Sequence, residues 1–178
     1  MELDALAVYF NVDRGALLAP LAILASSILG ASVALWAIFS NRHMSRLKNS
    51  MDFIASYNED EDITAAIREV TKLEDSSSND VQQLATDPHR DQARHIRTVL
   101  NYYEAMSVCI NRKIYSEKII KETLYTSMTD MWRICRPYVD ERRRQKKRNT
   151  YYQELQGIAE RWEKKPLKEK RAPGSNSL

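Results

Sequence analysis

The sequence predicts an all-α protein, in which one N-terminal transmembrane helix is followed by a cytoplasmic helical hairpin or bundle of three to four helices. Residues 16–39 form a run of 24 residues without a charged side chain. Beyond Asn41 the apolar residues recur at steps of three and four, which is the period of an α-helix. No segment alternates apolar and polar residues for long enough to predict a strand.

The average composition hides an uneven distribution of charge. The 178 residues include 27 Lys and Arg and 24 Asp and Glu, which gives a net charge of +3, as in an ordinary soluble domain. By region, however, the net charge is −2 in residues 1–41, −1 in residues 42–136 and +6 in residues 137–178. Two cysteines, five prolines and four glycines exclude a disulfide scaffold and a collagen-like chain.

The first predicted element, residues 16–39, is long enough to cross a bilayer, because a transmembrane helix needs about 20 apolar residues. Trp36 and Phe39 lie near its end, where aromatic rings favour the membrane interface. A buried core helix would have a polar face. A cleaved signal peptide would have a basic start and a shorter apolar stretch. We therefore predict a retained membrane anchor.

The basic residues that flank this anchor predict its orientation. Arg14 is the only base before it, whereas three follow closely: Arg42, Arg46 and Lys48. Basic flanks stay in the cytoplasm, so we expect a single-pass protein of the cell inner (plasma) membrane with its N-terminus outside. The expected domains are a short extracytoplasmic N-terminus (1–15), the transmembrane helix (16–39), a cytoplasmic helical domain (40–165) and a disordered tail (166–178).

Within the anchor, small residues recur every four positions, at Ala22, Ser26, Gly30 and Ala34. Such a stripe lets two membrane helices approach closely, and it predicts a homo-oligomer. Ala and Ser are also common in membrane helices, so chance composition remains the alternative.

The anchor helix is expected to continue to about Tyr57. Its predicted apolar stripe beyond the membrane is Met44, Leu47, Met51 and Ile54. A second helix follows an acidic cluster in which Asp62 is the expected cap. Residues 75–87 are predicted to be a polar loop, and Asp87 with Pro88 to begin the next helix.

A helical hairpin is the best-defined part of the sequence. The apolar face of its first arm comprises Ile96, Val99, Leu100, Tyr103, Met106, Ile110 and Ile114. The face of the second arm, with Ser116 as cap, comprises Ile120, Leu124, Met128, Met131, Cys135 and Tyr138. Pro137 is expected either to kink the second arm or to start a new helix. A last apolar face comprises Tyr151, Leu155, Ile158, Ala159 and Trp162.

Most of the positive charge lies in one run, which comprises Arg142, Arg143, Arg144, Lys146, Lys147 and Arg148. The run is either a solvated helix face or a polyanion-binding segment. Among polyanions we expect the anionic bilayer surface rather than nucleic acid, because the chain is tethered to a membrane and has no nucleic-acid-binding signature.

Residues with catalytic or metal-binding spacing are not evident. Neither cysteine has a nearby histidine, and no phosphate-binding loop or nucleophile motif is present. We expect no catalytic site, no metal and no cofactor, and we expect Cys109 and Cys135 to be thiols. Glu104 lies at the boundary of its helix's apolar face. It is expected to form a structural ion pair with an arginine of the neighbouring arm, with a ligand contact as the alternative.

Several short aromatic motifs resemble a known family. They are residues 100–106 (LNYYEAM), Trp132, residues 136–139 (RPYV), Arg142 and a Tyr-rich helix that ends near Trp162. Together with the single N-terminal span they resemble the bacterial and phage family called domain of unknown function 4760, over roughly residues 40–165. The resemblance implies a helical, membrane-anchored protein and supplies no known activity.

These observations lead to two functional expectations. The first is a membrane-anchored helical interaction or scaffold protein of unknown specific role, with the lipid bilayer, a second copy of the chain and an unidentified protein as partners. The second is a membrane effector, related to phage or defence, whose span oligomerises to perturb or regulate the bilayer.

Overall fold

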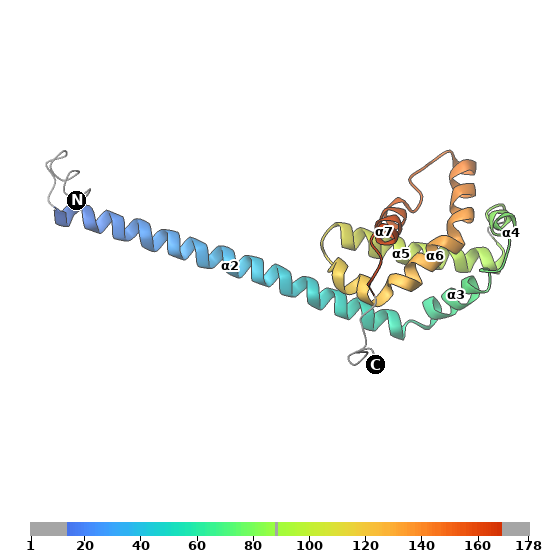
Figure 1. The fold of residues 1–178 in the computed structure, drawn as a ribbon, viewed down its shortest axis with the longest axis horizontal. Helices are drawn as coiled ribbons and strands as arrows, with labels where there is room; N and C mark the ends of the chain where they lie inside the picture. Colours follow the sequence, from blue (N-terminus) through green and yellow to red (C-terminus); the bar gives the residue numbers. More distant parts are fainter. Residues whose placement is uncertain (1–13, 88, 169–178) are drawn as a thin grey trace, which may run out of the picture. The chain divides into compact units, whose positions relative to one another are not determined.

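A computed structural model describes residues 14–87 and 89–168 of the chain, with side chains from Pro20 onward. The described residues form six α-helices and no strand, which confirms the all-α fold class with one long apolar N-terminal helix (Figure 1). The helices are α2 (Arg14–Glu59), α3 (Glu61–Thr71), α4 (Ser78–Gln83), α5 (Asp91–Asn111), α6 (Glu117–Lys146) and α7 (Gln153–Lys164). The chain divides into two compact units between Ser45 and Arg46.

The described part of the first unit is the N-terminal portion of α2, which is apolar and uncovered. Every residue from Pro20 to Phe39 is exposed, including Ile28 at 66% and Trp36 at 72%. The helix is long and apolar enough to cross a membrane, with a mean hydropathy of 2.1 over its most apolar window, none of which is buried. The core helix of a soluble protein is mostly buried, in contrast to this window of α2.

The second unit begins with the C-terminal end of α2, which packs through Ser50 and Ile54. The predicted stripe on this helix was partly wrong, because Met44 and Met51 are 60% and 56% exposed. At about 100° per residue, Met51 lies well round the helix from the face that Ser50 and Ile54 share with the half-buried Tyr57.

Two helix starts differ from the prediction. Asp60, rather than Asp62, caps α3, since its carboxylate accepts a hydrogen bond of 3.0 Å from the backbone N–H of Ile63. Helix α5 begins at Asp91, three residues after the predicted Pro88, which lies outside the described residues.

The predicted loop 75–87 contains the short helix α4. The side chain of Ser77 caps it by accepting a hydrogen bond from the N–H of Asp80. Val81 and Leu84 are buried, so the one apolar side of this segment completes the core despite its polar composition.

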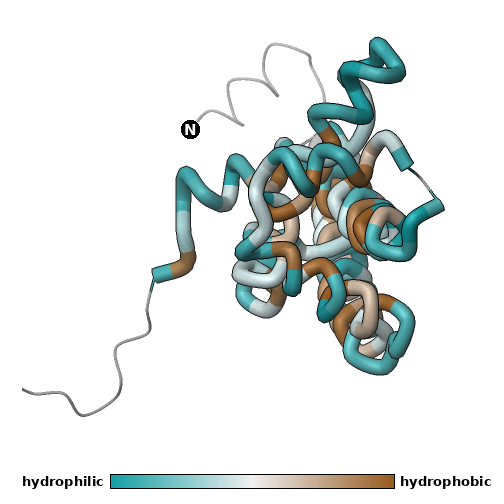
Figure 2. The backbone as a smooth tube through the Cα atoms, turned by 90° about the vertical axis from the view of Figure 1, so that its right-hand side faces the viewer, coloured by the Kyte–Doolittle hydropathy of each residue, from teal (hydrophilic) through white to brown (hydrophobic). Residues whose placement is uncertain are grey.

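Helices α5, α6 and α7 form the centre of the second unit. The predicted faces of α5 and α6 are buried, except that Ile114 is 45% exposed, because α5 ends at Asn111 and Ile114 lies in the turn that follows. Helix α7 packs on both through Leu155, Ile158, Ala159 and Trp162. Figure 2 shows hydrophilic positions along the outer edge of this unit and hydrophobic positions between its helices.

Helix α6 continues through Pro137, and its C-terminal part changes direction in Figure 1. This outcome favours the predicted kink over a new helix, since proline removes one helical hydrogen bond without ending the helix. Both cysteines are free thiols, with Cys135 fully buried on α6 and Cys109 half-buried on α5.

Candidate functional site

The small residues of the predicted packing stripe on α2 have no packing partner among the described residues of their own unit. Ala22, Ser26, Gly30 and Ala34 are exposed, and a Cβ atom added at Gly30 would meet nothing within 4 Å. The hydroxyl of Ser26 donates a hydrogen bond of 2.9 Å to the carbonyl of Ile23 on its own helix. The stripe is therefore not covered by any other described residue of its own unit.

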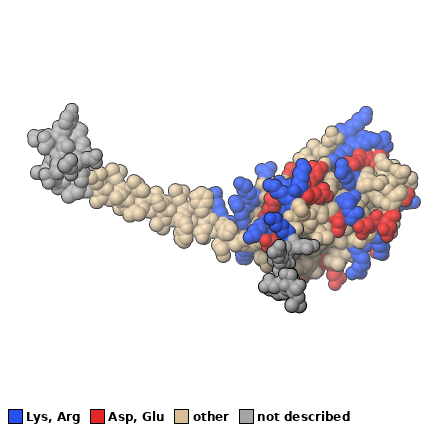
Figure 3. All heavy atoms as spheres, in the orientation of Figure 1, with Lys and Arg blue, Asp and Glu red and all other residues tan. Residues whose placement is uncertain are grey.

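The predicted basic run lies at the C-terminal end of α6, where Figure 3 shows basic side chains gathered. Three of its members make contacts within the protein. The Arg143 side chain is only 14% exposed and donates to the Tyr151 carbonyl at 2.6 and 3.0 Å. Arg142 donates to the Ala85 carbonyl at 3.4 Å.

Arg144 binds Glu141 at 2.6 and 2.8 Å, and this hydrogen-bonded arginine is the main reason why the pKa of Glu141 falls to about 2. The other three bases, Lys146, Lys147 and Arg148, are exposed. The run is therefore partly a structural element that joins α6 to its neighbours.

Glu104 caps helix α7. In place of an arginine of the neighbouring arm, its carboxylate accepts hydrogen bonds from the backbone N–H groups of Leu155 at 2.8 Å and Glu154 at 3.4 Å. Burial raises the pKa of Glu104, and the two backbone donors partly oppose that rise. Helix N-termini attract negative charge, so the carboxylate is placed to fix the start of α7 on α5.

Three hydroxyl groups join the end of α2 to α5 and α6. The Tyr103 hydroxyl lies 2.7 Å from that of Ser127 and 3.2 Å from that of Tyr57. Burial raises the pKa of Tyr103 far above its ordinary value, so this hydroxyl remains protonated and neutral within the contact. The neighbouring Tyr102 ring contacts Phe53 and Tyr57, with centroids 5.4 and 5.8 Å away.

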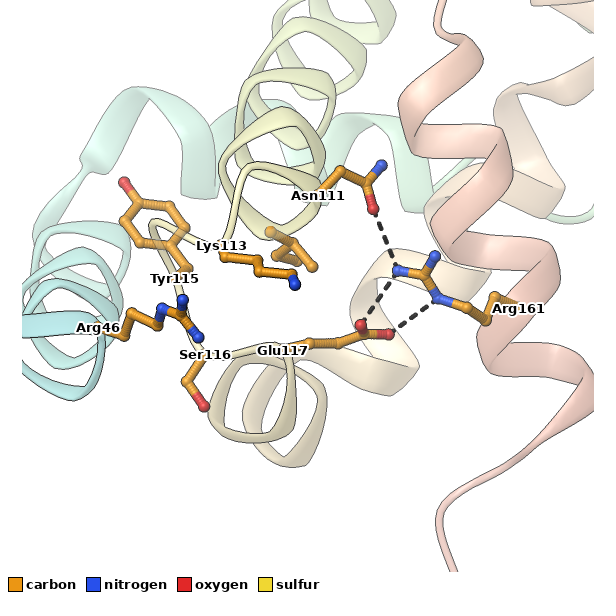
Figure 4. Close-up of a pocket in the computed structure, with 8 residues that line it drawn as sticks. Arg46, Asn111, Lys113, Tyr115, Ser116, Glu117 and Arg161 are labelled. Carbon is orange, nitrogen blue, oxygen red and sulfur yellow. Dashed lines mark hydrogen bonds and ion pairs between the residues drawn. The ribbon is translucent and has the colours of Figure 1, made fainter. Parts of the chain in front are cut away.

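A pocket of about 380 Å³ lies where the turn between α5 and α6 meets the second-unit part of α2 and the C-terminal part of α7 (Figure 4). Its lining comprises Arg46, Ile110, Asn111, Lys113, Tyr115, Ser116, Glu117 and Arg161. The turn is held by the buried hydroxyl of Ser50, which accepts from the Ser116 N–H at 2.7 Å and donates to the Arg46 carbonyl at 2.7 Å. Ser116, the predicted cap, precedes α6 without a side-chain capping bond.

Of the three basic side chains that line this pocket, only Arg161 pairs with a carboxylate among the described residues. The guanidinium of Arg161 holds the Glu117 carboxylate at 3.0 and 3.1 Å, and Trp162 donates to the same carboxylate at 2.9 Å. Among the described residues no carboxylate pairs with Arg46 or Lys113. Figure 4 shows this contrast, with dashed contacts from Arg161 to Glu117 and Asn111 and none on Arg46 or Lys113. The pocket was not predictable from local sequence spacing, because Arg46 and Lys113 are 67 positions apart.

A family model described as "Domain of unknown function (DUF4760)" matches residues 24–162. The chain belongs to this family. The match confirms the resemblance and begins earlier than the predicted residue 40, so it includes part of the apolar segment of α2. No curated protein and no solved structure matches the chain.

In this DUF4760 protein the motifs that carried the resemblance hold helices together. Tyr103 joins α2 to α6, Glu104 caps α7, and Trp162 binds Glu117. Trp132, Tyr138 and Val139 are buried in the core. Among the described residues, no group of three or more His, Cys, Asp or Glu side chains could hold a metal ion.

Proposed function

We propose that this DUF4760 protein is a single-pass membrane-anchored helical interaction or scaffold protein that self-associates through α2. One observation carries the proposal: all residues from Pro20 to Phe39 are exposed, although they form the most apolar segment of the described chain. Water would have to solvate this whole surface, which is far larger than the apolar patches that soluble monomers expose. A bilayer covers such a helix on every side.

The charges after this segment support the orientation. Arg42, Arg46 and Lys48 follow the apolar residues within about two and a half turns of α2. Basic residues at this position are retained on the cytoplasmic side, so we place the helical domain there, at the inner (plasma) membrane.

Self-association is supported by the open face of α2. The stripe around Gly30 is unobstructed, and Met44 and Met51 follow Gly30 at intervals of 14 and 21 residues, which are multiples of seven. Both methionines are more than half exposed. A seven-residue spacing keeps positions on nearly one side of a helix, as a two-helix contact requires.

The helical domain is assigned to binding rather than catalysis. Its motif side chains are committed to interhelix contacts, as described for Tyr103, Glu104 and Trp162. A rigid, tethered domain of this kind acts by placement, because the anchor concentrates it on the membrane surface where its partner would bind.

Membrane insertion and orientation have direct tests. The full chain is expected to remain in the membrane fraction after alkaline carbonate extraction, whereas release into the supernatant would contradict the anchor. Alkaline phosphatase fused after Leu178 is expected to be inactive, because that enzyme requires the oxidising periplasm. An active fusion would contradict the orientation.

Self-association is tested with a matched pair of substitutions. Gly30→Ile adds a branched side chain to the stripe, whereas Ala31→Ile adds the same side chain about 100° round the helix. In a membrane association assay with the full chain, Gly30→Ile is expected to lower the dimer fraction at least tenfold and Ala31→Ile to leave it unchanged. Equal effects would contradict the assigned face. Depolarisation on overexpression that Gly30→Ile abolishes would instead favour the membrane effector.

A further inference from the structure

The pocket at the turn between α5 and α6 has the chemistry of a phosphate site. Three basic side chains and one carboxylate line it, which gives a net charge of +2. The carboxylate of Glu117 already has a two-point contact with Arg161, so Arg46 and Lys113 supply the unmatched charge. Arg46 is half-buried, and holding a cation there without a carboxylate costs solvation that a bound anion would restore.

The backbone adds donors to the same pocket. Helix α6 begins at its rim, and the N–H groups of a helix's first turn have no acceptor within the helix. Ser116, the residue before α6, makes no side-chain capping bond, and its own N–H is taken by the Ser50 hydroxyl. An anion bound in the pocket would thus lie near two cations and the N-terminal end of α6.

Lys113 occupies a position where a lysine is unfavourable for the fold. Its φ of 59° lies in the left-handed region, where glycine is the preferred residue at a helix C-terminus. The motif is closed by hydrogen bonds from the Ile114 N–H to the Cys109 carbonyl and from the Lys113 N–H to the Ile110 carbonyl. The lysine in this place carries its ammonium group to the pocket.

The chain itself indicates the source of the anion. Arg46 follows Phe39, the last residue of the apolar segment, by seven positions, which is about 10 Å of helix. An arginine side chain at that distance reaches the headgroup layer, which extends about 5–8 Å beyond the hydrocarbon. The basic run, in contrast, starts 25 residues along α6 from Glu117, or about 38 Å of helix path.

We propose that this pocket, through Arg46 and Lys113, binds the phosphate of an anionic phospholipid headgroup on the cytoplasmic surface. This inference rests on the proposed membrane anchoring. Bound lipid would fix the helical domain against the surface from which α2 emerges, and the partly committed run at the end of α6 would remain available for other contacts.

The test uses the full chain in lipid nanodiscs and compares spin-labelled phosphatidylglycerol with spin-labelled phosphatidylcholine by electron paramagnetic resonance. The wild-type chain is expected to restrict phosphatidylglycerol in preference to phosphatidylcholine. Arg46→Gln and Lys113→Gly are each expected to lower that preference at least about fivefold, because each removes one of the two charge-assisted contacts to the phosphate. Lys147→Gly is the matched control, since it removes the same charge at another left-handed position, with a φ of 50°. It is expected to leave the preference unchanged.

Two further comparisons separate the alternatives. Arg42→Gln removes a base that is nearer the apolar segment but outside the pocket. If general surface attraction explained the lipid preference, this variant would lose at least as much of it as Lys113→Gly does. That result would overturn the proposal. An equal loss in Lys147→Gly would also overturn it, in favour of the basic run. Calorimetric titration with glycerol phosphate in phosphatidylcholine nanodiscs is expected to show no binding. Saturable binding that depends on Lys113 would overturn the lipid as the ligand and identify a soluble phosphate compound in its place.

Failure of the anchor gives a different result. A chain that does not enter the nanodisc restricts neither lipid and separates from the discs on gel filtration. A chain that enters and restricts both lipids equally contradicts the headgroup site alone.

Discussion

Glu104→Ala is predicted to loosen helix α7 from the rest of the helical domain. The substitution leaves the N–H groups of Leu155 and Glu154 without their acceptor. Leu155 is only 1% exposed, so little water can reach its N–H. Loss of an N-terminal cap costs about 1 kcal/mol, and an unpaired buried donor adds about 1 kcal/mol or more. We therefore expect the free energy of unfolding to fall by about 2 kcal/mol.

The isosteric variant separates the hydrogen bonds from the charge. Glu104→Gln retains one acceptor oxygen, so we expect a loss of less than about 1 kcal/mol. For a domain of this size each kcal/mol shifts Tm by about 3–5 °C, so Glu104→Ala is expected to lower Tm by about 6–10 °C. The measurement is thermal unfolding of the detergent-solubilised full chain followed by near-ultraviolet circular dichroism, which reports aromatic packing. Equal Tm values for the two variants would refute the capping role.

The pH dependence gives a second check on the same residue. Burial raises the pKa of Glu104 in the folded chain, so the folded state binds more protons than the unfolded state between the two pKa values. Its contribution to stability is complete below the unfolded pKa and is lost as pH rises through the folded pKa. The stability of the wild type relative to Glu104→Gln should therefore be greater at pH 4 than at pH 7. A difference that grows with pH would contradict the stated effect of burial.

Three further predictions use the same unfolding assay. Ser50→Ala leaves the part-buried N–H of Ser116 without its acceptor and is expected to lower stability by about 1 kcal/mol, whereas an unchanged Tm would contradict the role of this hydrogen bond. Lys113→Gly and Lys147→Gly each place glycine at a position with left-handed backbone dihedrals, where a residue with a Cβ atom is strained. Each should raise the free energy of unfolding by about 1 kcal/mol, and a fall in Tm would contradict this. Hydrogen bonding to Arg144 and Gln145 lowers the pKa of Glu141 to about 2, so its contribution is present above the unfolded pKa and is lost as pH falls toward 2. The Tm difference between wild type and Glu141→Gln should shrink over that range, and a constant difference would refute it.

The faces of α5 and α6 were predictable because their apolar residues repeat over many turns. Each face is wide, and the one misassigned residue, Ile114, lies beyond the end of α5, where the spacing of apolar residues does not reveal that the helix has stopped. The exposed apolar portion of α2 followed from its length and lack of charge in the same way.

Short or one-sided elements were harder to predict. Helix α4 has six residues and buries only Val81 within its bounds, so its apolar period is too short to distinguish it from a loop. Met51 has the spacing of a core residue, yet the tertiary contacts of α2 select the face of Ser50 and Ile54 instead. The buried serine is the larger surprise, and its hydrogen bonds to the α5–α6 turn explain it.

Side-chain partners across the fold could not be read from local spacing. Glu104 was expected to meet an arginine on the neighbouring arm, but the start of α7 reaches it first and offers two backbone donors. Arg143 belongs to a run that looks uniform in sequence, and only the path of the chain after α6 brings the Tyr151 carbonyl to it. Likewise, nothing near Lys113 in sequence indicates Arg46 as its neighbour in the pocket.

The difference in burial between the two thiols makes it possible to measure how often the helical core opens. Cys135 is 0% exposed, and burial raises its pKa to about 12, whereas Cys109 is only half-buried. Alkylating reagents attack the thiolate, so Cys135 reacts only in molecules whose core has transiently opened. With Cys109→Ser in place, the rate of alkylation measures that opening in intact membranes, where calorimetry of a single protein is impractical. Lipid composition, self-association and partner binding could then each be tested for their effect on the stability of the domain without extracting it.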